Sequence, residues 1–246
     1  MSNGAPSVLP AADDKAAAVE AMFDRIAGRY DRLNRILTLR MDLGWRRTAA
    51  RELALSGRAR VLDIACGTGD FCRELDRCGH TAIGVDFSAG MLAAARARVP
   101  LVRADALRLP VRDGCLDGLT CGFALRNFTA IEPVLAESAR VLRDGGRIVL
   151  LDVAEPESRL VRVGHAFWFR HVVPFVGGRL SDREAYRYLP ESTSYLPEPS
   201  GLRAMVRDAG FDAVQRRTFL FGTAQLITAT RRIRDGSRGT GVGNTR

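Results

Sequence analysis

The chain has one lysine, Lys15, among its 37 basic residues, so nearly all of its positive charge is carried by arginine. This bias is typical of GC-rich coding and does not by itself indicate nucleic-acid contacts. The five cysteines are odd in number and include no C-x-x-C pair, which indicates reduced thiols rather than a disulfide framework. No histidine-rich cluster accompanies Cys66, Cys72 and Cys78, and we therefore expect no metal site.

Long apolar runs are also missing. The longest, such as Ile148–Leu151 and Val172–Val176, fall far short of the roughly 20 residues that span a bilayer. Residues 1–12 lack the basic start and apolar core of a signal peptide. These absences predict a cytoplasmic protein. The net charge of +9 would suit an anionic membrane surface or a polynucleotide, and it is weak evidence for either.

What the chain does contain is a nucleoside-binding pattern. Residues 60–70 have the form of an apolar strand, the glycine-paired turn Cys66–Gly69 and the start of a helix. Glycines in such a turn let the backbone approach a nucleoside closely. A second apolar run, Thr81–Asp86, ends in an acid that suits the vicinal hydroxyls of a ribose.

The identity of the nucleoside follows from two further residues. Cys72 stands where the dinucleotide fingerprint has its third glycine, so the motif is incomplete for NAD or FAD and disfavours a nicotinamide oxidoreductase. Asp63 would repel a pyrophosphate but could pair with a cationic amino group. S-adenosylmethionine (SAM) has a ribose at one end, an ammonium at the other and no phosphate. The pattern resembles the first motif of class I SAM-dependent methyltransferases.

Short apolar runs alternate with amphipathic stretches over residues 57–153, which predicts a parallel sheet covered on both faces. The expected strands are 59–64, 81–85, 101–103, 116–121, 146–153, 211–218 and 224–230, and the expected helices are 71–78, 90–98, 131–142 and 200–209. The last two strands form a hairpin with an antiparallel strand near the sheet edge, as methyltransferases have. The predicted fold is α/β, a Rossmann-like class I methyltransferase with a mostly parallel seven-stranded sheet.

We expect one methyltransferase domain over residues 13–230. Residues 13–55 carry apolar side chains at helical spacing and are interpreted as an N-terminal helical lid. Residues 157–197 form an insertion, interpreted as a cap over the acceptor, whose aromatic stretch would suit peripheral membrane contact. Residues 1–12 and the arginine-rich tail 231–246 are predicted to be disordered.

Acids and small residues at the carboxyl ends of the expected strands form the candidate cofactor site. Asp86 would hold the ribose, and Asp105 with Ala106 lies where this fold addresses adenine. Each acid alone could instead cap a helix or a turn, but the ordered set favours a ligand site. The candidate cofactor-binding residues are Asp63, Gly67, Thr68, Gly69, Asp86, Phe87, Met91, Asp105, Ala106 and Gly122.

Several blocks in the right order resemble the ubiquinone/menaquinone-biosynthesis C-methyltransferase family. They are Tyr30–Asn34 with Trp45, Leu125–Asn127, Arg140–Arg147 and Tyr186–Ser192, within a similarity that covers about residues 21–230. The resemblance implies methyl transfer from SAM to a ring carbon of a prenylated quinol, as in demethylmenaquinol to menaquinol or the equivalent ubiquinone precursor. It is compatible with a homodimer and with contact at the inner face of the membrane. No nucleic-acid partner is expected.

By this resemblance Arg126, Asn127 and Tyr30 are the candidate catalytic residues. Arg126 could stabilise a phenolate, Asn127 orient the ring or a water, and Tyr30 approach from the lid. Taken alone, Arg126 would more often form a surface ion pair beside a helix, residues 129–142, that Asn127 caps. The proline-aromatic motif of DNA and RNA amino-methyltransferases is absent from this position.

Some positions depart from the family pattern. Gly122 stands in place of a common serine, Asp152-Val-Ala154 in place of Glu-x-Ser, and Asp42 in place of a histidine before Trp45. The last strand also lacks the family's usual histidine-containing ending. These departures concern the acceptor rather than SAM, so two alternatives stay open. One is a paralogue that methylates another phenolic, polyketide or lipid acceptor, and the other is a non-catalytic SAM-binding or RNA-binding protein.

Overall fold

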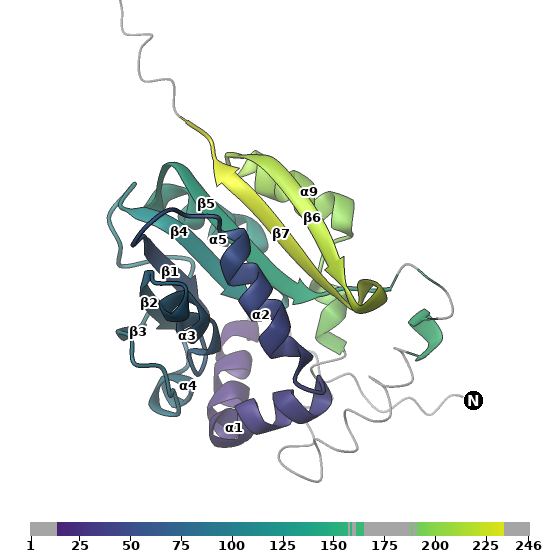
Figure 1. Ribbon diagram of the computed structural model, residues 1–246. Helices are drawn as coiled ribbons and strands as arrows, with labels where there is room; N and C mark the ends of the chain where they lie inside the picture. Colours follow the sequence, from purple (N-terminus) through teal and green to yellow (C-terminus); the bar gives the residue numbers. More distant parts are fainter. Residues whose placement is uncertain (1–13, 157, 159–160, 165–187, 189–190, 234–246) are drawn as a thin grey trace, which may run out of the picture.

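The computed structural model describes residues 14–156, 158, 161–164, 188 and 191–233. Seven strands form one sheet in the order β3-β2-β1-β4-β5-β7-β6 (Figure 1). The strands are β1 (Arg60–Ile64), β2 (Thr81–Asp86), β3 (Leu101–Arg103), β4 (Leu116–Gly122), β5 (Leu142–Val153), β6 (Phe211–Phe219) and β7 (Ala224–Arg231). The helices are α1 (Lys15–Leu37), α2 (Met41–Glu52), α3 (Asp70–Arg77), α4 (Ala89–Ala93), α5 (Ile131–Val141) and α9 (Pro199–Asp208), with short 3-10 turns η1 (Leu125–Asn127), η3 (Ser192–Tyr195) and η4 (Leu220–Gly222).

The sheet has the predicted topology. Strands β1 to β5 pair in parallel, and β7 runs antiparallel between β5 and β6. All seven predicted strands are present, although β5 begins at Leu142 rather than at residue 146. The extension arises because Leu142 pairs with Leu116 before the β4–β5 register shifts, so the chain enters the sheet directly after α5.

Two helical layers cover the sheet (Figure 1). Helices α2 and α3 pack on one face, where Leu53, Phe71 and Leu75 join residues of β1, β5 and β7 in a buried cluster. Helices α5 and α9 pack on the other face, which contains the largest cluster of buried apolar residues. Because strand side chains alternate between the faces, Leu62 and Ile64 of β1 point to the α5 side while Val61 points to the α2 side. This confirms the α/β sandwich expected from the sequence.

The predicted N-terminal lid is two helices with separate roles. Helix α1 ends at Leu37, and Leu39 and Arg40 adopt positive φ angles of 51° and 65° that cannot continue a right-handed helix. Helix α2 then leaves in a new direction and packs on the sheet beside α3 (Figure 1). Helix α1 crosses the carboxyl edge of the strands, where it contacts α4.

Helix α4 is shorter than predicted and ends at Ala93. The backbone N–H of Arg96 donates to the carbonyl of Thr68 at 3.2 Å instead of continuing the helix. A contact with the glycine turn therefore replaces the last helical turn, and sequence periodicity does not report such a contact. The termini and most of the expected cap, including its aromatic stretch 166–170, lie outside the described residues. Among the helices described, none is long and apolar enough to cross a membrane.

Candidate active site

A cavity lies at the carboxyl ends of β1, β2, β3 and β4, beneath α1. We call it the glycine-turn cavity, and its empty volume is about 1080 Å³, including space open to solvent. It is lined by segments 65–68, 85–88, 104–107, 122–124 and 127–129, by Asp70 and Met91, and by Ala16, Val19, Glu20, Phe23, Tyr30 and Arg46. The carboxyl ends of parallel strands are where open α/β sheets bind their ligands.

Most of the predicted cofactor residues meet here. Gly67, Thr68, Asp86, Phe87, Met91, Asp105, Ala106 and Gly122 all line the glycine-turn cavity. Asp63 and Gly69 are not among its described lining residues. The tertiary structure therefore brings together residues at the ends of four strands, β1 to β4, that lie as much as 55 positions apart in the chain.

The glycine turn has the conformation that its composition predicts. Gly67 and Gly69 have φ angles of +56° and +80°, which residues with a side chain rarely adopt. A Cβ atom at Gly69 would lie 2.5 Å from the Cβ of Ala97, and one at Gly67 would lie 3.2 Å from Cε of Met91. Gly69 thus permits close packing of the turn, while Gly67 keeps the cavity floor open.

Asp86 ends β2 and is joined to this turn. Its Oδ2 accepts a 2.7 Å hydrogen bond from the backbone N–H of Gly67, and its Oδ1 accepts one of 2.8 Å from the N–H of Ser88. Burial raises the pKa of this carboxyl, although the backbone donors oppose the shift. Each oxygen retains a lone pair, so the carboxylate can accept hydrogen bonds from a ribose in the cavity.

Asp63 occupies a different environment from the one that the sequence suggested. Strand alternation places its side chain on the α3 face of β1, where Oδ1 accepts from the Thr120 hydroxyl at 2.7 Å and Oδ2 from the Cys72 thiol at 3.6 Å. Burial raises the pKa of this carboxyl to about 7. Its described contacts are therefore internal to the core and not on the cavity surface.

Asp105 follows β3 and is exposed. Its Oδ1 accepts a 2.9 Å hydrogen bond from the backbone N–H of Leu107, so it caps its own turn. It also lines the glycine-turn cavity, as does the buried Ala106. The turn function and the adenine-side position predicted from the sequence are compatible, because a carboxylate accepts several hydrogen bonds.

Helix α1 is held over the cavity by carboxylates. The Thr68 hydroxyl donates to Oδ1 of Asp31 at 2.5 Å, and the backbone N–H of Gly90 donates to Oδ1 of Asp24 at 2.8 Å. The Ser88 hydroxyl also donates to Asp24. These bonds connect the helix to the loops after β1 and β2, so α1 forms the roof of the cavity.

A second, mostly apolar cavity adjoins the first and has an empty volume of about 1540 Å³, again including space open to solvent. We call it the apolar cavity. Its described lining consists of Tyr30, Asn34, Leu37, Thr38, Leu39, Met41, Asp42, Trp45, Arg46, Phe123, Arg126, Val153, Val161, Gly164, Leu220, Phe221 and Thr223. Tyr30, Arg46 and Phe123 line both cavities and mark their junction.

Of the predicted catalytic residues, Tyr30 lies at this junction. Its ring packs edge-to-face on Phe23 with centroids 5.8 Å apart. Burial raises the pKa of its phenol, while Arg46 and a hydrogen bond with Asn34 oppose the shift. A neutral phenol at the junction can donate or accept one hydrogen bond toward a bound molecule.

Arg126 and Asn127 are adjacent in sequence but face different cavities. Arg126 lines the apolar cavity, and its Nη1 donates to Oδ1 of Asp152 at 2.5 Å and to the Phe123 carbonyl at 2.9 Å. Asn127 lines the glycine-turn cavity and accepts a 3.3 Å hydrogen bond from the Tyr188 hydroxyl. Arg126 is buried, so the alternative of a surface ion pair is wrong, and the cap position of α5 is Ala130 rather than Asn127.

Two described residues of the block Tyr186–Ser192, Tyr188 and Ser192, meet this segment in space. The Ser192 hydroxyl accepts from Nε of Arg126 at 3.2 Å, and buried Tyr188 reaches Asn127. Burial raises the pKa of Tyr188 to about 12, which keeps its hydroxyl a donor. Tyr186 lies outside the described residues. Two sequence blocks that are about 60 residues apart thus form one cluster at the edge of both cavities.

Sequence reasoning missed Arg46 and Phe123, both of which lie at the junction, and it noted Asp42 only as a departure. Arg46 directly follows Trp45 in the N-terminal block, so its neighbourhood was a usable signal. The sequence could not show that the Arg46 side chain points to the cavities, because this depends on how helix α2 packs on the sheet. Asp42, which is buried, accepts from Nη1 of Arg46 at 2.8 Å.

Comparison with known proteins identifies the family of this chain. The sequence model of the ubiE/COQ5 methyltransferase family matches residues 11–231. The chain belongs to this family. It is 42% identical to a demethylmenaquinone methyltransferase of Roseiflexus castenholzii, over 92% of this chain and 98% of that protein. It is 44% identical to the demethylmenaquinone methyltransferase of Deinococcus radiodurans, over 89% and 95% respectively.

A further relative, 38% identical, is the ubiquinone/menaquinone biosynthesis C-methyltransferase of Syntrophotalea carbinolica, with 86% of this chain and 93% of that protein covered. Among solved structures, a SAM-dependent methyltransferase of Thermotoga maritima aligns with a TM-score of 0.63 at 21% identity and covers 87% of this chain and all of that one. At this identity the structural likeness shows the fold alone, which is that of class I methyltransferases.

Proposed function

We propose that this protein transfers a methyl group from SAM to a ring carbon of a prenylated quinol, such as demethylmenaquinol or the equivalent ubiquinone precursor. The observation that carries the proposal is the meeting of two unlike cavities at Tyr30, Arg46 and Phe123. One has the glycine turn and acids of a nucleoside site, and the other has an apolar lining. The relatives described above carry the same activity in their names.

The residues of the glycine-turn cavity fit SAM. Gly67 leaves the cavity floor without a side chain, and Asp86 offers its carboxylate at the end of β2. Asp70 also lines the cavity, where its carboxylate is paired with Arg35 at 2.6 Å and with Arg73. SAM bound here would supply an electrophilic methyl group. The chain would then orient the donor and exclude water beneath α1.

The apolar cavity suits the acceptor. Aromatic and aliphatic side chains dominate its lining. Its polar lining residues are Tyr30, Asn34, Thr38, Asp42, Arg46, Arg126 and Thr223. A quinol ring has the matching character, with an apolar face and two hydroxyl groups. Its prenyl chain would leave along the lining toward Leu39 and Phe221.

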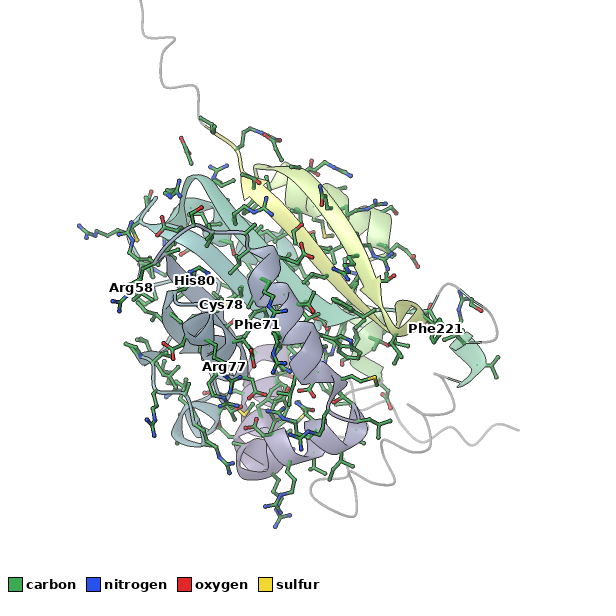
Figure 2. All side chains as sticks on the ribbon, in the orientation of Figure 1. Arg58, Phe71, Arg77, Cys78, His80 and Phe221 are labelled. Carbon is green, nitrogen blue, oxygen red and sulfur yellow. The ribbon has the colours of Figure 1, made fainter. Side chains whose placement is uncertain are left out.

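We further propose that the protein works from the cytoplasmic side with this opening against the membrane. Leu39 and Phe221 line the apolar cavity but are 69% and 78% exposed, and Leu220 beside Phe221 is 44% exposed. Figure 2 shows Phe221 at turn η4, on the opposite side of the molecule from Arg58 and His80. Exposed Arg40 adds positive charge beside Leu39, which suits anionic lipids.

The expected homodimer can be tested by light scattering.

The test is methyl transfer by the purified protein to a panel of acceptors, with the product identified by mass spectrometry. We expect SAM-dependent methylation of reduced demethylmenaquinone or of the ubiquinone precursor, and none of the oxidised quinone, because only the quinol ring is a carbon nucleophile. Methylation of an unrelated phenol or lipid in place of both quinols would instead support the paralogue. SAM binding without turnover on any acceptor would support the non-catalytic alternative.

A further inference from the structure

Arg46 is the guanidinium at the junction of the two cavities. It comes from α2, lines both cavities and is only 5% exposed. Its Cζ lies 4.9 Å from the centroid of the Phe123 ring, so the aromatic face supports one side of the guanidinium plane. A charged group in this position is costly to bury unless it has partners. The hydrogen-bond acceptors of Arg46 therefore show which of its N–H groups are left to bind a ligand.

One carboxylate holds Arg46 in place. Its Nη1 donates to Oδ2 of Asp42 at 2.8 Å, and Asp42 is itself buried. The same carboxylate accepts from Nη1 of Arg35 at 2.9 Å and from the Thr38 hydroxyl at 2.7 Å. Asp42 thus orients Arg46 but shares its negative charge with a second guanidinium. Among the described residues, Nε and Nη2 of Arg46 have no hydrogen-bond acceptor.

Arg126 differs from Arg46 in this respect. Its Nη1 makes two bonds, to Asp152 and to the Phe123 carbonyl, and its Nε donates to Ser192. Arg126 lines the apolar cavity but not the glycine-turn cavity. The buried carboxylate of Asp152 pairs with Arg126 at 2.5 Å and, among the described ion pairs, with no second guanidinium. Of the two guanidiniums, Arg46 has more N–H groups without an acceptor among the described residues. It also lines the glycine-turn cavity, where SAM would bind, and Arg126 does not.

We propose that Arg46 is a catalytic residue that binds the acceptor's ring oxygen next to the carbon receiving the methyl group and stabilises it as a phenolate. The inference rests on the proposed function and deepens it. Asp42 is then a positioning residue that holds the guanidinium plane. This assigns the phenolate to Arg46, whereas Arg126 organises the surrounding cluster.

The reaction balances as follows. The acceptor hydroxyl loses its proton to solvent water, and the phenolate directs electron density to the neighbouring ring carbon. That carbon bonds to the methyl carbon while the methyl–sulfur bond breaks and its electron pair stays on sulfur. The hydrogen on the ring carbon then leaves as a proton, the ring regains aromaticity, and the phenolate is reprotonated. One methyl group is transferred and one proton is released. Arg46 stabilises the phenolate before methyl transfer and again after the ring proton leaves, and it donates a hydrogen bond to the oxygen of the neutral dienone in between.

The first test compares Arg46→Gln and Arg46→Lys with Arg47→Gln. Arg47 is the neighbouring exposed arginine, and it lines neither cavity. We expect Arg46→Gln to lower kcat about 100-fold or more, the scale of losing one oxyanion donor, and to leave the Kd for SAM within about threefold. Arg46→Lys should recover part of kcat, and Arg47→Gln should behave as the parent protein. Thermal unfolding of each variant checks that it folds.

The second test is independent of turnover. It uses 1-naphthol, whose naphtholate has its own absorbance band, bound to the SAM-free protein and titrated with pH. We expect the bound naphthol to have a lowered pKa in the parent protein and in Arg47→Gln, but not in Arg46→Gln. This readout stands even where no quinol is methylated, so it separates this inference from the proposed function.

Two results would overturn the proposal. One is a kcat of Arg46→Gln within threefold of the parent on the acceptor that is turned over. The other is a naphthol pKa that is unchanged by Arg46→Gln but raised by Arg126→Gln, which would assign the phenolate to Arg126. A loss of kcat in Arg46→Gln together with an equal loss in a folded Asp42→Asn variant, and recovery in Arg46→Lys, would support it.

Discussion

The backbone N–H of Gly67 donates a 2.7 Å hydrogen bond to the carboxylate of Asp86, which joins the turn after β1 to the end of β2. These two residues are 19 positions apart. The bond forms because parallel pairing of β1 and β2 brings both strand ends to one edge of the sheet. It orients the carboxylate at the place where a ribose would lie, and it makes the turn and the acid one unit.

Asp86→Ala should therefore weaken SAM binding strongly. Charged hydrogen bonds are worth about 1.5–3 kcal/mol each, so the loss of two to the ribose should raise the Kd at least 100-fold. Isothermal titration calorimetry measures this directly. Asp113→Ala, at an exposed acid paired with Arg140, is the matched control and should bind SAM normally. An unchanged Kd for Asp86→Ala would place the ribose elsewhere.

Asp63 should make stability depend on pH. Its pKa is raised from 3.8 to about 7 on folding, so between these values the folded state binds more protons than the unfolded chain. The free energy of unfolding should thus fall as pH rises from about 4 to 7, by up to about 1.4 kcal/mol per pH unit from this group. Denaturant unfolding of Asp63→Asn at several pH values should show a flatter dependence than the parent. Equal slopes would contradict the assignment.

Gly122→Ser tests why this chain departs from the usual serine. A Cβ atom at Gly122 would lie 2.9 Å from Cδ2 of Phe71, which packs in the core under α2. We expect the substitution to destabilise the fold by about 1–3 kcal/mol, the range for overpacking. Adding Phe71→Leu, which removes the ring, should restore part of the loss. Additive destabilisation by the two changes in denaturant melts would argue against the contact.

Phe221→Ser tests the membrane-facing opening. Phe221 is 78% exposed at η4, just before β7 begins, whereas Ile233 is 71% exposed just after the other end of β7. Phe221→Ser should reduce cosedimentation with vesicles of phosphatidylglycerol and phosphatidylcholine several-fold, since an apolar side chain at the bilayer interface is lost. Ile233→Ser is the control and should bind as the parent protein does. An equal loss of vesicle binding in both variants would show nonspecific hydrophobic binding rather than binding through the face that carries Phe221.

Periodicity in the sequence predicted the sheet well. The run at 81–85 lies within a residue of β2, because a strand inside the sheet needs apolar residues along its length. The run at 211–218 lies within a residue of β6, which is a mostly exposed edge strand. The break between α1 and α2 was not predicted. It depends on positive φ angles at Leu39 and Arg40, residues that carry no turn signal in their side chains.

The sequence by itself determined the class of fold, the glycine turn and the acid at the end of β2, and hence a site for a nucleoside-bearing methyl donor. These features depend on local chemistry: the conformational freedom of glycine, strand patterning and the reach of a carboxylate. The tertiary structure alone decided which side chains face which cavity. Asp63 turns into the core because strand residues alternate between faces, and Arg46 reaches the junction because α2 packs on the sheet. The direction in which a side chain points depends on contacts between distant segments. Sequence motifs therefore cannot predict which residues lie beside the acceptor.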